Sequence, residues 1–208
     1  MPTRAQIVSF AGDEAPPGES PWVAGRGPSP YVAVVEPDPS WPERSAQVAA
    51  TVRSALGWRV LALEHVGSTA VAGLAAKPTL DLDMVLADPD AEDAYVPALE
   101  SLGFVLTVRE PWWQGHRLLR LDPPALGESL GCHLHVFGPD SAEPWKHRLF
   151  RDWLRAHPDE RELYAAAKRS AADAANAAGE HAMLYNARKQ DVVRAIYARA
   201  FRAAGLSD

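Results

Sequence analysis

The sequence predicts an α/β (α+β) fold in which helices flank a mixed β-sheet and the C-terminal third is helical. Short apolar runs with strand-like alternation are interleaved with helical patterns through the first two thirds of the chain. The last third is rich in alanine and keeps helical spacing. A chain of 208 residues with 47% hydrophobic content can bury one good core. We therefore expect a single domain over residues 31–208 and an appended segment over residues 1–30.

The N-terminal segment is expected to be irregular or disordered, because proline and glycine recur in it and apolar periodicity is lacking. Trp22 is its candidate contact with the domain. A short strand is predicted over residues 31–35. A first helix should then begin after Ser40, where Glu43 completes a capping box, and end near Gly57.

The middle of the chain contains two strand-like runs, Val60 to Val66 and Thr79 to Leu86, joined by a turn and short helix beginning at Gly67-Ser68. Asp81 and Asp83 share one face of the second run, since side chains alternate along a strand. Carboxylates two residues apart on a strand lie within about 7 Å, close enough to hold one divalent cation. Unpaired carboxylates in a buried strand would be costly, so a cation or a basic partner is expected.

The later elements follow from apolar spacing and from breaking residues. They are a helix between Asp88 and Gly103, strands at 104–108, 116–121 and 132–137, and helices near 141–156, 159–177 and 184–203. His133 and His135 alternate on the last of these strands and so share one face. They suit zinc, manganese or nickel, or a role as base or phosphate donor; the alternative is that they hydrogen-bond within the sheet.

Composition limits the partners. A formal charge of -6 argues against general nucleic-acid binding, while it allows a local basic pocket for a phosphorylated ligand. The single cysteine, Cys132, excludes an intramolecular disulfide and is expected to be a buried, inert thiol. The absence of a long apolar run or a leader pattern argues against a membrane partner and favours a cytoplasmic protein. The oligomeric state is not predicted.

Taken together, these segments resemble the GrpB-like family, a branch of the nucleotidyltransferase (polymerase-beta-like) superfamily. The resemblance is carried by Trp41-Pro42, Glu64 through Val71, Gly73-Leu74, Lys77-Pro78, Asp81, His133 through Val136, and Arg148 through Arg155. It implies a nucleotidyltransferase-like sheet in which Gly67 and Ser68 hold nucleotide phosphates and Asp81 and Asp83 hold a divalent cation, magnesium or manganese.

The sequence departs from the superfamily at the third carboxylate, whose place on a neighbouring strand is taken by histidine. The implied catalytic residues are therefore Asp81, Asp83 and His135, and His133 joins them as a metal ligand, so that zinc or nickel becomes an alternative. Asp81 matches the family pattern more dependably than Asp83 and is the first candidate ligand.

Three basic residues complete the predicted phosphate site: Lys77, Arg148 and Lys189. Arg148 belongs to a stripe with Arg151 and Arg155 on one helix face, and the alternative is a solvated stripe paired with acidic neighbours. Lys189 pairs with Tyr185 at i, i+4 and would close the pocket from the C-terminal side. His116, Arg117 and Arg120 are further candidates for the same pocket.

The resemblance implies a protein that binds a nucleotide or other phosphorylated ligand with a divalent cation and transfers a nucleotidyl group to an unknown acceptor. The alternative is a non-catalytic, ligand-binding accessory module of coenzyme A metabolism, because GrpB-like domains are joined to dephospho-coenzyme A kinase in some proteins. The chain lacks a P-loop motif of its own.

Overall fold

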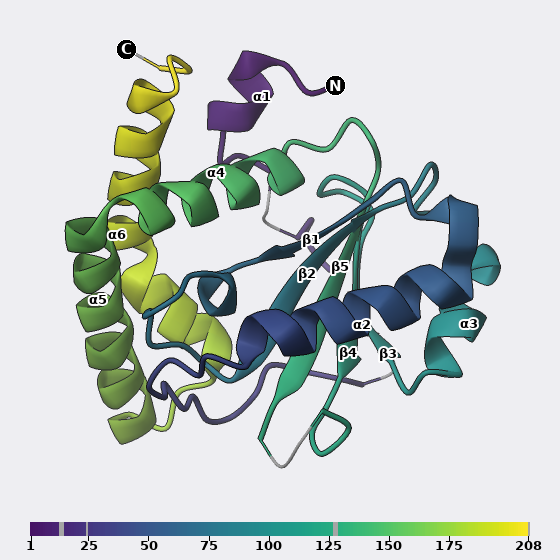
Figure 1. The fold of residues 1–208 in the computed structure, drawn as a ribbon, viewed down its shortest axis with the longest axis horizontal. Coiled ribbons are helices and arrows are strands. Elements are labelled where there is room, and N and C mark those ends of the chain that lie inside the picture. Colours follow the sequence, from purple (N-terminus) through teal and green to yellow (C-terminus); the bar gives the residue numbers. More distant parts are fainter. Residues whose placement is uncertain (13–14, 24, 127–128, 208) are drawn as a thin grey trace.

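The computed structural model describes residues 1–12, 15–23, 25–126 and 129–207. At its centre is a five-stranded sheet with strand order β1-β2-β5-β4-β3 (Figure 1). β2 and β5 are parallel, and the other neighbouring pairs are antiparallel. The strands are β1 Ala62–Val66, β2 Thr79–Val85, β3 Val105–Glu110, β4 His116–Leu121 and β5 Gly131–Phe137.

Helices flank this sheet, and three of them make up the last third of the chain. The α-helices are α1 Arg4–Val8, α2 Trp41–Leu56, α3 Val96–Glu100, α4 Glu143–Ala156, α5 Pro158–Ala177 and α6 Ala182–Ala203. Short 3-10 helices are η1 Gly57–Arg59, η2 Ser68–Ala70 and η3 Glu92–Ala94. The predicted mixed sheet with a helical C-terminal third is confirmed. Among the described residues, the helices fall short of the length and apolar character that a membrane crossing requires.

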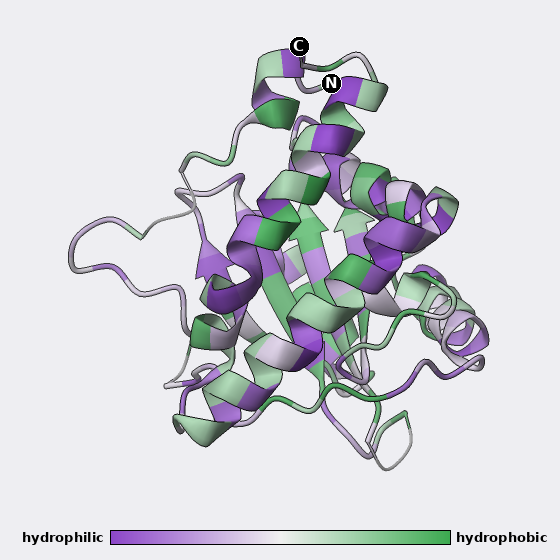
Figure 2. Ribbon diagram, turned by 90° about the vertical axis from the view of Figure 1, so that its left-hand side faces the viewer, coloured by the Kyte–Doolittle hydropathy of each residue, from purple (hydrophilic) through white to green (hydrophobic). Residues whose placement is uncertain are grey.

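The two faces of the sheet differ in chemistry. Leu80, Leu82 and Met84 of β2 join the main hydrophobic core together with buried side chains of α2, which crosses in front of the sheet in Figure 1. The other face of β2 carries Asp81 and Asp83, which stand opposite the two histidines of β5 in the parallel register. Figure 2 shows the hydrophobic strand segments at the centre of the molecule, between helices of mixed hydropathy. Strand alternation thus separates the core from a polar face.

Three local predictions were wrong. Residues 31–35 form no strand, and only an isolated bridge joins Val35 to Ala76. Ser40 precedes α2 as predicted, but its backbone is helical and its side chain makes no capping hydrogen bond. The expected helix between Asp88 and Gly103 is divided into η3 and α3, because Pro97 cannot donate a backbone hydrogen bond and so suits the first turn of a new helix.

The N-terminal segment is more ordered than its composition suggested. α1 begins with a capping box between Thr3 and Gln6, and Ile7 is buried in a second hydrophobic cluster with residues of α4 and α6. The ring of Phe10 lies 5.3 Å from that of Tyr197. Trp22 bridges Val108 through its backbone. The segment therefore packs on α6 and β3 through its described residues.

Candidate phosphate and metal site

The loop after β1 packs directly on Asp81. Gly67 has φ 68° and ψ -167°, a conformation that favours glycine. A Cβ atom at Gly67 would lie 2.3 Å from Oδ2 of Asp81. His65 Nε2 lies 3.0 Å from Thr69 Oγ1, which donates to the carbonyl of Thr79 at 3.2 Å. The η2 turn is thereby fixed above the start of β2, with no space between glycine and carboxylate for a side chain.

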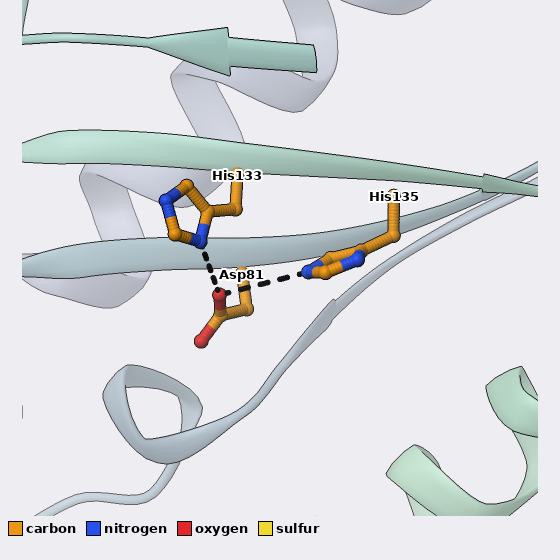
Figure 3. Close-up of side chains that lie close together, drawn as sticks. All are labelled: Asp81, His133 and His135. Carbon is orange, nitrogen blue, oxygen red and sulfur yellow. Dashed lines mark ion pairs between the residues drawn. The ribbon is translucent and has the colours of Figure 1, made fainter. Parts of the chain in front are cut away.

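Asp81, His133 and His135 form a cluster whose ligand atoms all lie within 4.8 Å of one another (Figure 3). Oδ1 of Asp81 is 3.5 Å from His133 Nδ1 and 3.8 Å from His135 Nε2. Two atoms bound to one tetrahedral ion at about 2.1 Å stand roughly 3.4 Å apart, so these separations fit a shared divalent cation. One carboxylate with two imidazoles is a donor set that zinc, manganese or nickel accepts more readily than magnesium.

The pKa values of Asp81 and His133 are shifted in directions that suit metal binding. Burial alone would raise the pKa of Asp81, but its two histidine neighbours, His133 and His135, outweigh it and hold that pKa below its usual range. Burial lowers the pKa of His133, against the opposing effect of Asp81. An ionised carboxylate beside a neutral imidazole is a ready ligand pair for a cation.

A chain of hydrogen bonds behind the cluster orients His135. Its Nδ1 lies 3.0 Å from Nε2 of His116, and Nδ1 of His116 lies 2.7 Å from Oε2 of Glu110. A carboxylate only accepts hydrogen bonds, so Glu110 draws the His116 proton to Nδ1, and His116 Nε2 then accepts from His135 Nδ1. This leaves the lone pair of His135 Nε2 facing Asp81. Such partners of a ligating histidine fix its tautomer and ring orientation.

Asp83 lies outside this cluster, contrary to its predicted role beside Asp81. Its side chain is only 1% exposed, and Oδ2 accepts a 2.8 Å hydrogen bond from Nδ1 of His147 on α4. Burial alone would lower the pKa of His147, but the Asp83 carboxylate outweighs it and raises that pKa to about 9. The two residues therefore form a buried ion pair that anchors α4 to the sheet. A basic partner was predicted for a carboxylate buried in this strand, and for Asp83 that partner is His147.

A cavity of about 170 Å³ opens beside Asp81, between the η2 turn, the start of β2 and helices α5 and α6. It is lined by Gly67, Ser68, Lys77, Thr79, Asp81, Tyr164, Lys168, Tyr185, Asn186 and Lys189. The structure thus brings together four of the predicted phosphate-binding residues with the first predicted metal ligand. Three lysines in one small cavity make it strongly attractive to an anion.

Lys168 is the lining residue that sequence reasoning missed. It is only 2% exposed, and its Nζ has no hydrogen-bond partner among the described residues. Nζ lies 4.5 Å from the centre of the Tyr164 ring. Burial and then the nearby Lys189 charge lower the pKa of Lys168 to about 6. A buried amine without a partner is costly unless a ligand completes its environment.

A signal for Lys168 was present in the sequence. The buried positions of α5 include Tyr164, Lys168, Ala171, Ala172 and Ala175. Glu160, one turn before Tyr164, is the other charged residue among these buried positions. A lysine between Tyr164 and the alanines departs from the pattern of surface helices, which place charge on the opposite side.

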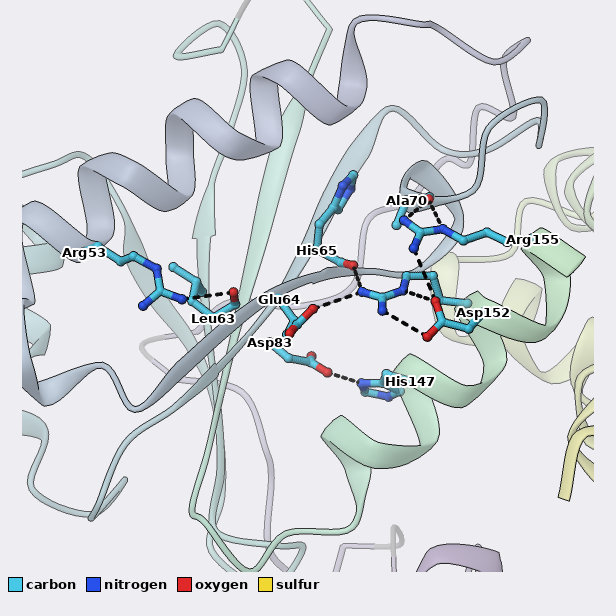
Figure 4. A network of polar contacts seen from close by, with 10 residues as sticks. Arg53, Leu63, Glu64, His65, Ala70, Asp83, His147, Asp152 and Arg155 are labelled. Carbon is cyan, nitrogen blue, oxygen red and sulfur yellow. Dashed lines mark hydrogen bonds and ion pairs between the residues drawn. The ribbon is translucent and has the colours of Figure 1, made fainter. Parts of the chain in front are cut away.

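The arginines of α4 follow the predicted alternative in part, because Arg151 and Arg155 pair with Asp152 (Figure 4 shows Asp152 and Arg155). Arg148 lies over the ring of Trp145 at 4.6 Å and is not among the residues lining the lysine cavity. Arg151 donates to Glu64 and to the carbonyl of His65, and Arg155 donates twice to the carbonyl of Ala70. Both also contact Asp152. The stripe ties α4 to β1 and to the η2 turn.

The three candidates on β4, which are His116, Arg117 and Arg120, have different surroundings. His116 belongs to the chain behind His135, as described above. Arg117, near the start of β4, forms ion pairs with Glu92 and Asp90. Arg120 lines a second cavity, which shares Lys77 and Thr79 with the first.

Cys132 is fully buried as predicted, and burial raises the pKa of its thiol.

Comparison with known proteins places the chain in a family. The family model described as GrpB protein matches residues 31–199, so the chain belongs to the GrpB family. A UPF0157 protein of Halalkalibacterium halodurans is 42% identical over 141 residues, which cover 68% of this chain and 69% of that protein. The crystal structure of conserved protein GrpB from Enterococcus faecalis superimposes with a TM-score of 0.70 at 26% identity and covers 83% of this chain and 99% of that one.

Two further matches are more distant. A dephospho-CoA kinase of Mycolicibacterium paratuberculosis is 32% identical over 166 residues, which cover 67% of this chain but 39% of that protein. Cid1 in complex with its short product ApU, a solved structure, aligns with a TM-score of 0.47 at 12% identity, over 64% of this chain and 42% of that one.

Proposed function

We propose that the chain binds a ligand with a phosphate chain, such as a nucleoside triphosphate, together with a divalent cation. The observation that carries the proposal is Lys168, whose buried amine has no hydrogen-bond partner in the part of the chain that the structure describes and lines a cavity with Lys77 and Lys189. A bound anion favours the charged form of Lys168, and the three lysines then match the charge of a di- or triphosphate better than that of a single carboxylate. Asp81 at the wall of this cavity also belongs to the Asp81, His133 and His135 cluster, so cation and phosphates would meet there.

The residues of the site fit roles in nucleotidyl transfer. The oxygen of an acceptor hydroxyl would bond to the α-phosphorus and release its proton to solvent. The bond between the α-phosphorus and the oxygen that bridges to the β-phosphate would break, and pyrophosphate would leave. Lys77, Lys168 and Lys189 would hold the phosphates and offset the charge that develops on the leaving group, and Ser68 would donate from its hydroxyl. A divalent cation held by Asp81, His133 and His135, with zinc, manganese or nickel preferred over magnesium, would polarise the phosphate oxygens.

Inorganic tripolyphosphate tests the binding step without assuming a particular nucleoside. We expect Lys168→Met to weaken its binding at least 10-fold in calorimetric titration. The unliganded variant should be as stable as the parent, or more so, because an unpaired buried amine is removed. Arg169→Met is the matched control: it removes the neighbouring charge on α5 but lies outside this cavity, and we expect less than a twofold change.

The lowered pKa of Lys168 supplies a second readout. At pH 8 an amine with a pKa of about 6 is neutral, and a bound anion favours its charged form. Tripolyphosphate binding at pH 8 should therefore take up close to one proton, measured by titration in two buffers of different ionisation enthalpy, and Lys168→Met should abolish the uptake. Unchanged affinity and unchanged proton uptake in Lys168→Met would refute the proposal.

A non-catalytic accessory module is the second candidate. It is favoured by the relative named dephospho-CoA kinase, of which this chain matches only a part, and by the single carboxylate in the metal cluster. Pyrophosphate release from nucleoside triphosphates with manganese or zinc, measured with candidate hydroxyl acceptors, separates the two. Tight binding without release, unchanged by Asp81→Asn, would favour the module.

A further inference from the structure

A second cavity, of about 230 Å³, adjoins the lysine cavity and has no part in phosphate binding as described so far. Lys77 and Thr79 line both cavities. His133 lines the second, while Asp81, its partner in the metal cluster, lines the first. The two cavities therefore flank the same short stretch before β2 and the same candidate metal ligands. A ligand whose phosphates occupy the first cavity would direct its remaining part toward the second.

The lining of the second cavity differs from that of the first. Ala33, Pro78 and Pro123 are apolar residues of its lining, whereas Ser29, Asp122 and Ser129 supply groups that can hydrogen-bond to hydroxyls and ring heteroatoms. It contains one lysine where the first contains three. Small ligand sites commonly combine apolar walls with a few polar groups of this kind.

Two features of the second cavity lack the partners that side chains of their type usually have. Tyr31 is 66% exposed although it lines the cavity. Arg120 lies with its guanidinium 5.4 Å from the Trp22 ring, and its buried Nε has no hydrogen-bond partner among the described residues. An uncovered aromatic ring suits stacking against a planar ring, and a buried guanidinium N–H suits an acceptor atom on the same ligand.

We propose that this second cavity is the subsite for the nucleoside part of the ligand, with the base against Tyr31 and the phosphates extending past Lys77 into the lysine cavity. The proposal rests on the proposed function, which it extends from phosphate binding to nucleotide recognition. It also gives residues 29–33, which join the N-terminal segment to the domain, a role in ligand selection. Ala182 at the start of α6 lines the same cavity, and its backbone N–H donates to the carbonyl of Ser29 at 2.9 Å.

The test compares inorganic tripolyphosphate with ATP, GTP, CTP and UTP in calorimetric titration of the full chain. Stacking on an aromatic side chain strengthens binding by roughly 5- to 150-fold, so at least one nucleotide should bind that much more tightly than tripolyphosphate. Tyr31→Ala should remove this advantage and leave tripolyphosphate affinity within twofold of the parent. Tyr31→Phe should restore it, because the ring is kept.

Trp58→Ala is the control, since Trp58 is 83% exposed and lines a different cavity. We expect this variant to bind both tripolyphosphate and the nucleotides as tightly as the parent does. The subsite is refuted if no nucleotide exceeds tripolyphosphate, or if the advantage survives Tyr31→Ala. Failure of tripolyphosphate itself to bind would refute the proposed function, and the nucleoside subsite with it.

Discussion

Asp81 and Asp83 lie two residues apart on the same face of β2, yet their surroundings differ in almost every respect. Asp81 is partly exposed, contacts the imidazoles of His133 and His135 and lines a cavity with three lysines. Asp83 is buried and paired with a protonated His147. The strand places both carboxylates on one face, and the elements packed above the strand decide which becomes a ligand-facing group and which becomes a structural anchor.

The largest expected effect separates the two aspartates by stability. Asp83→Ala should destabilise the fold by roughly 1.5 to 3 kcal/mol, because His147, whose side chain is 29% exposed, loses its charge-assisted hydrogen bond to the buried carboxylate. Asp81→Asn should change the unliganded stability by less than about 1 kcal/mol but abolish most stabilisation by added zinc or manganese. Urea denaturation with chelator and then with metal measures both. An equal loss of unfolding free energy in the two variants would contradict the different roles assigned to Asp81 and Asp83.

The dependence of stability on pH sharpens the assignment of Asp83. The folded pKa of His147 is about 9, above the unfolded value of about 6.5. The ion pair therefore contributes its full stability below about pH 6.5, and that contribution is lost as pH rises through 9. The parent's free energy of unfolding should exceed that of the double variant Asp83→Asn/His147→Gln, and this difference should shrink by up to roughly 3 kcal/mol as pH rises from about 6.5 to 9. A constant advantage from pH 6.5 to 9 would show that the pair is not charged.

The smallest expected effect concerns the loop that packs on Asp81. Gly67 and Gly73 both have positive φ, 68° and 76°, so alanine at either position costs about 1 kcal/mol of backbone strain. Only at Gly67 does the new Cβ meet a carboxylate at 2.3 Å, whereas at Gly73 the nearest atom is 3.9 Å away. Gly67→Ala should therefore cost roughly 1 to 3 kcal/mol more than Gly73→Ala, in chelator, by urea denaturation. Similar losses would mean that the loop can move off Asp81.

The sequence by itself determined the fold class and the set of residues on the polar face. Alternation in β2 and β5 required that Asp81, Asp83, His133 and His135 share a side of their strands, and the parallel register brings these pairs together. The positions of proline and glycine and the spacing of apolar residues predicted the five strands and the C-terminal helices to within a few residues. These features depend on local periodicity, which a sequence carries directly.

Only the tertiary structure decided how that polar face is used. Whether a carboxylate meets a histidine of α4 or a lysine cavity depends on contacts between segments about 60 or more residues apart, as in the pair of Asp83 and His147. The same applies to Lys168, whose burial against Tyr164 and α6 converts an ordinary helix lysine into an unpartnered amine. It applies also to Arg148, which the helical stripe grouped with Arg151 and Arg155 but which stacks on Trp145. Periodicity specifies the face of an element, whereas the partner on that face is set by the packing of distant segments.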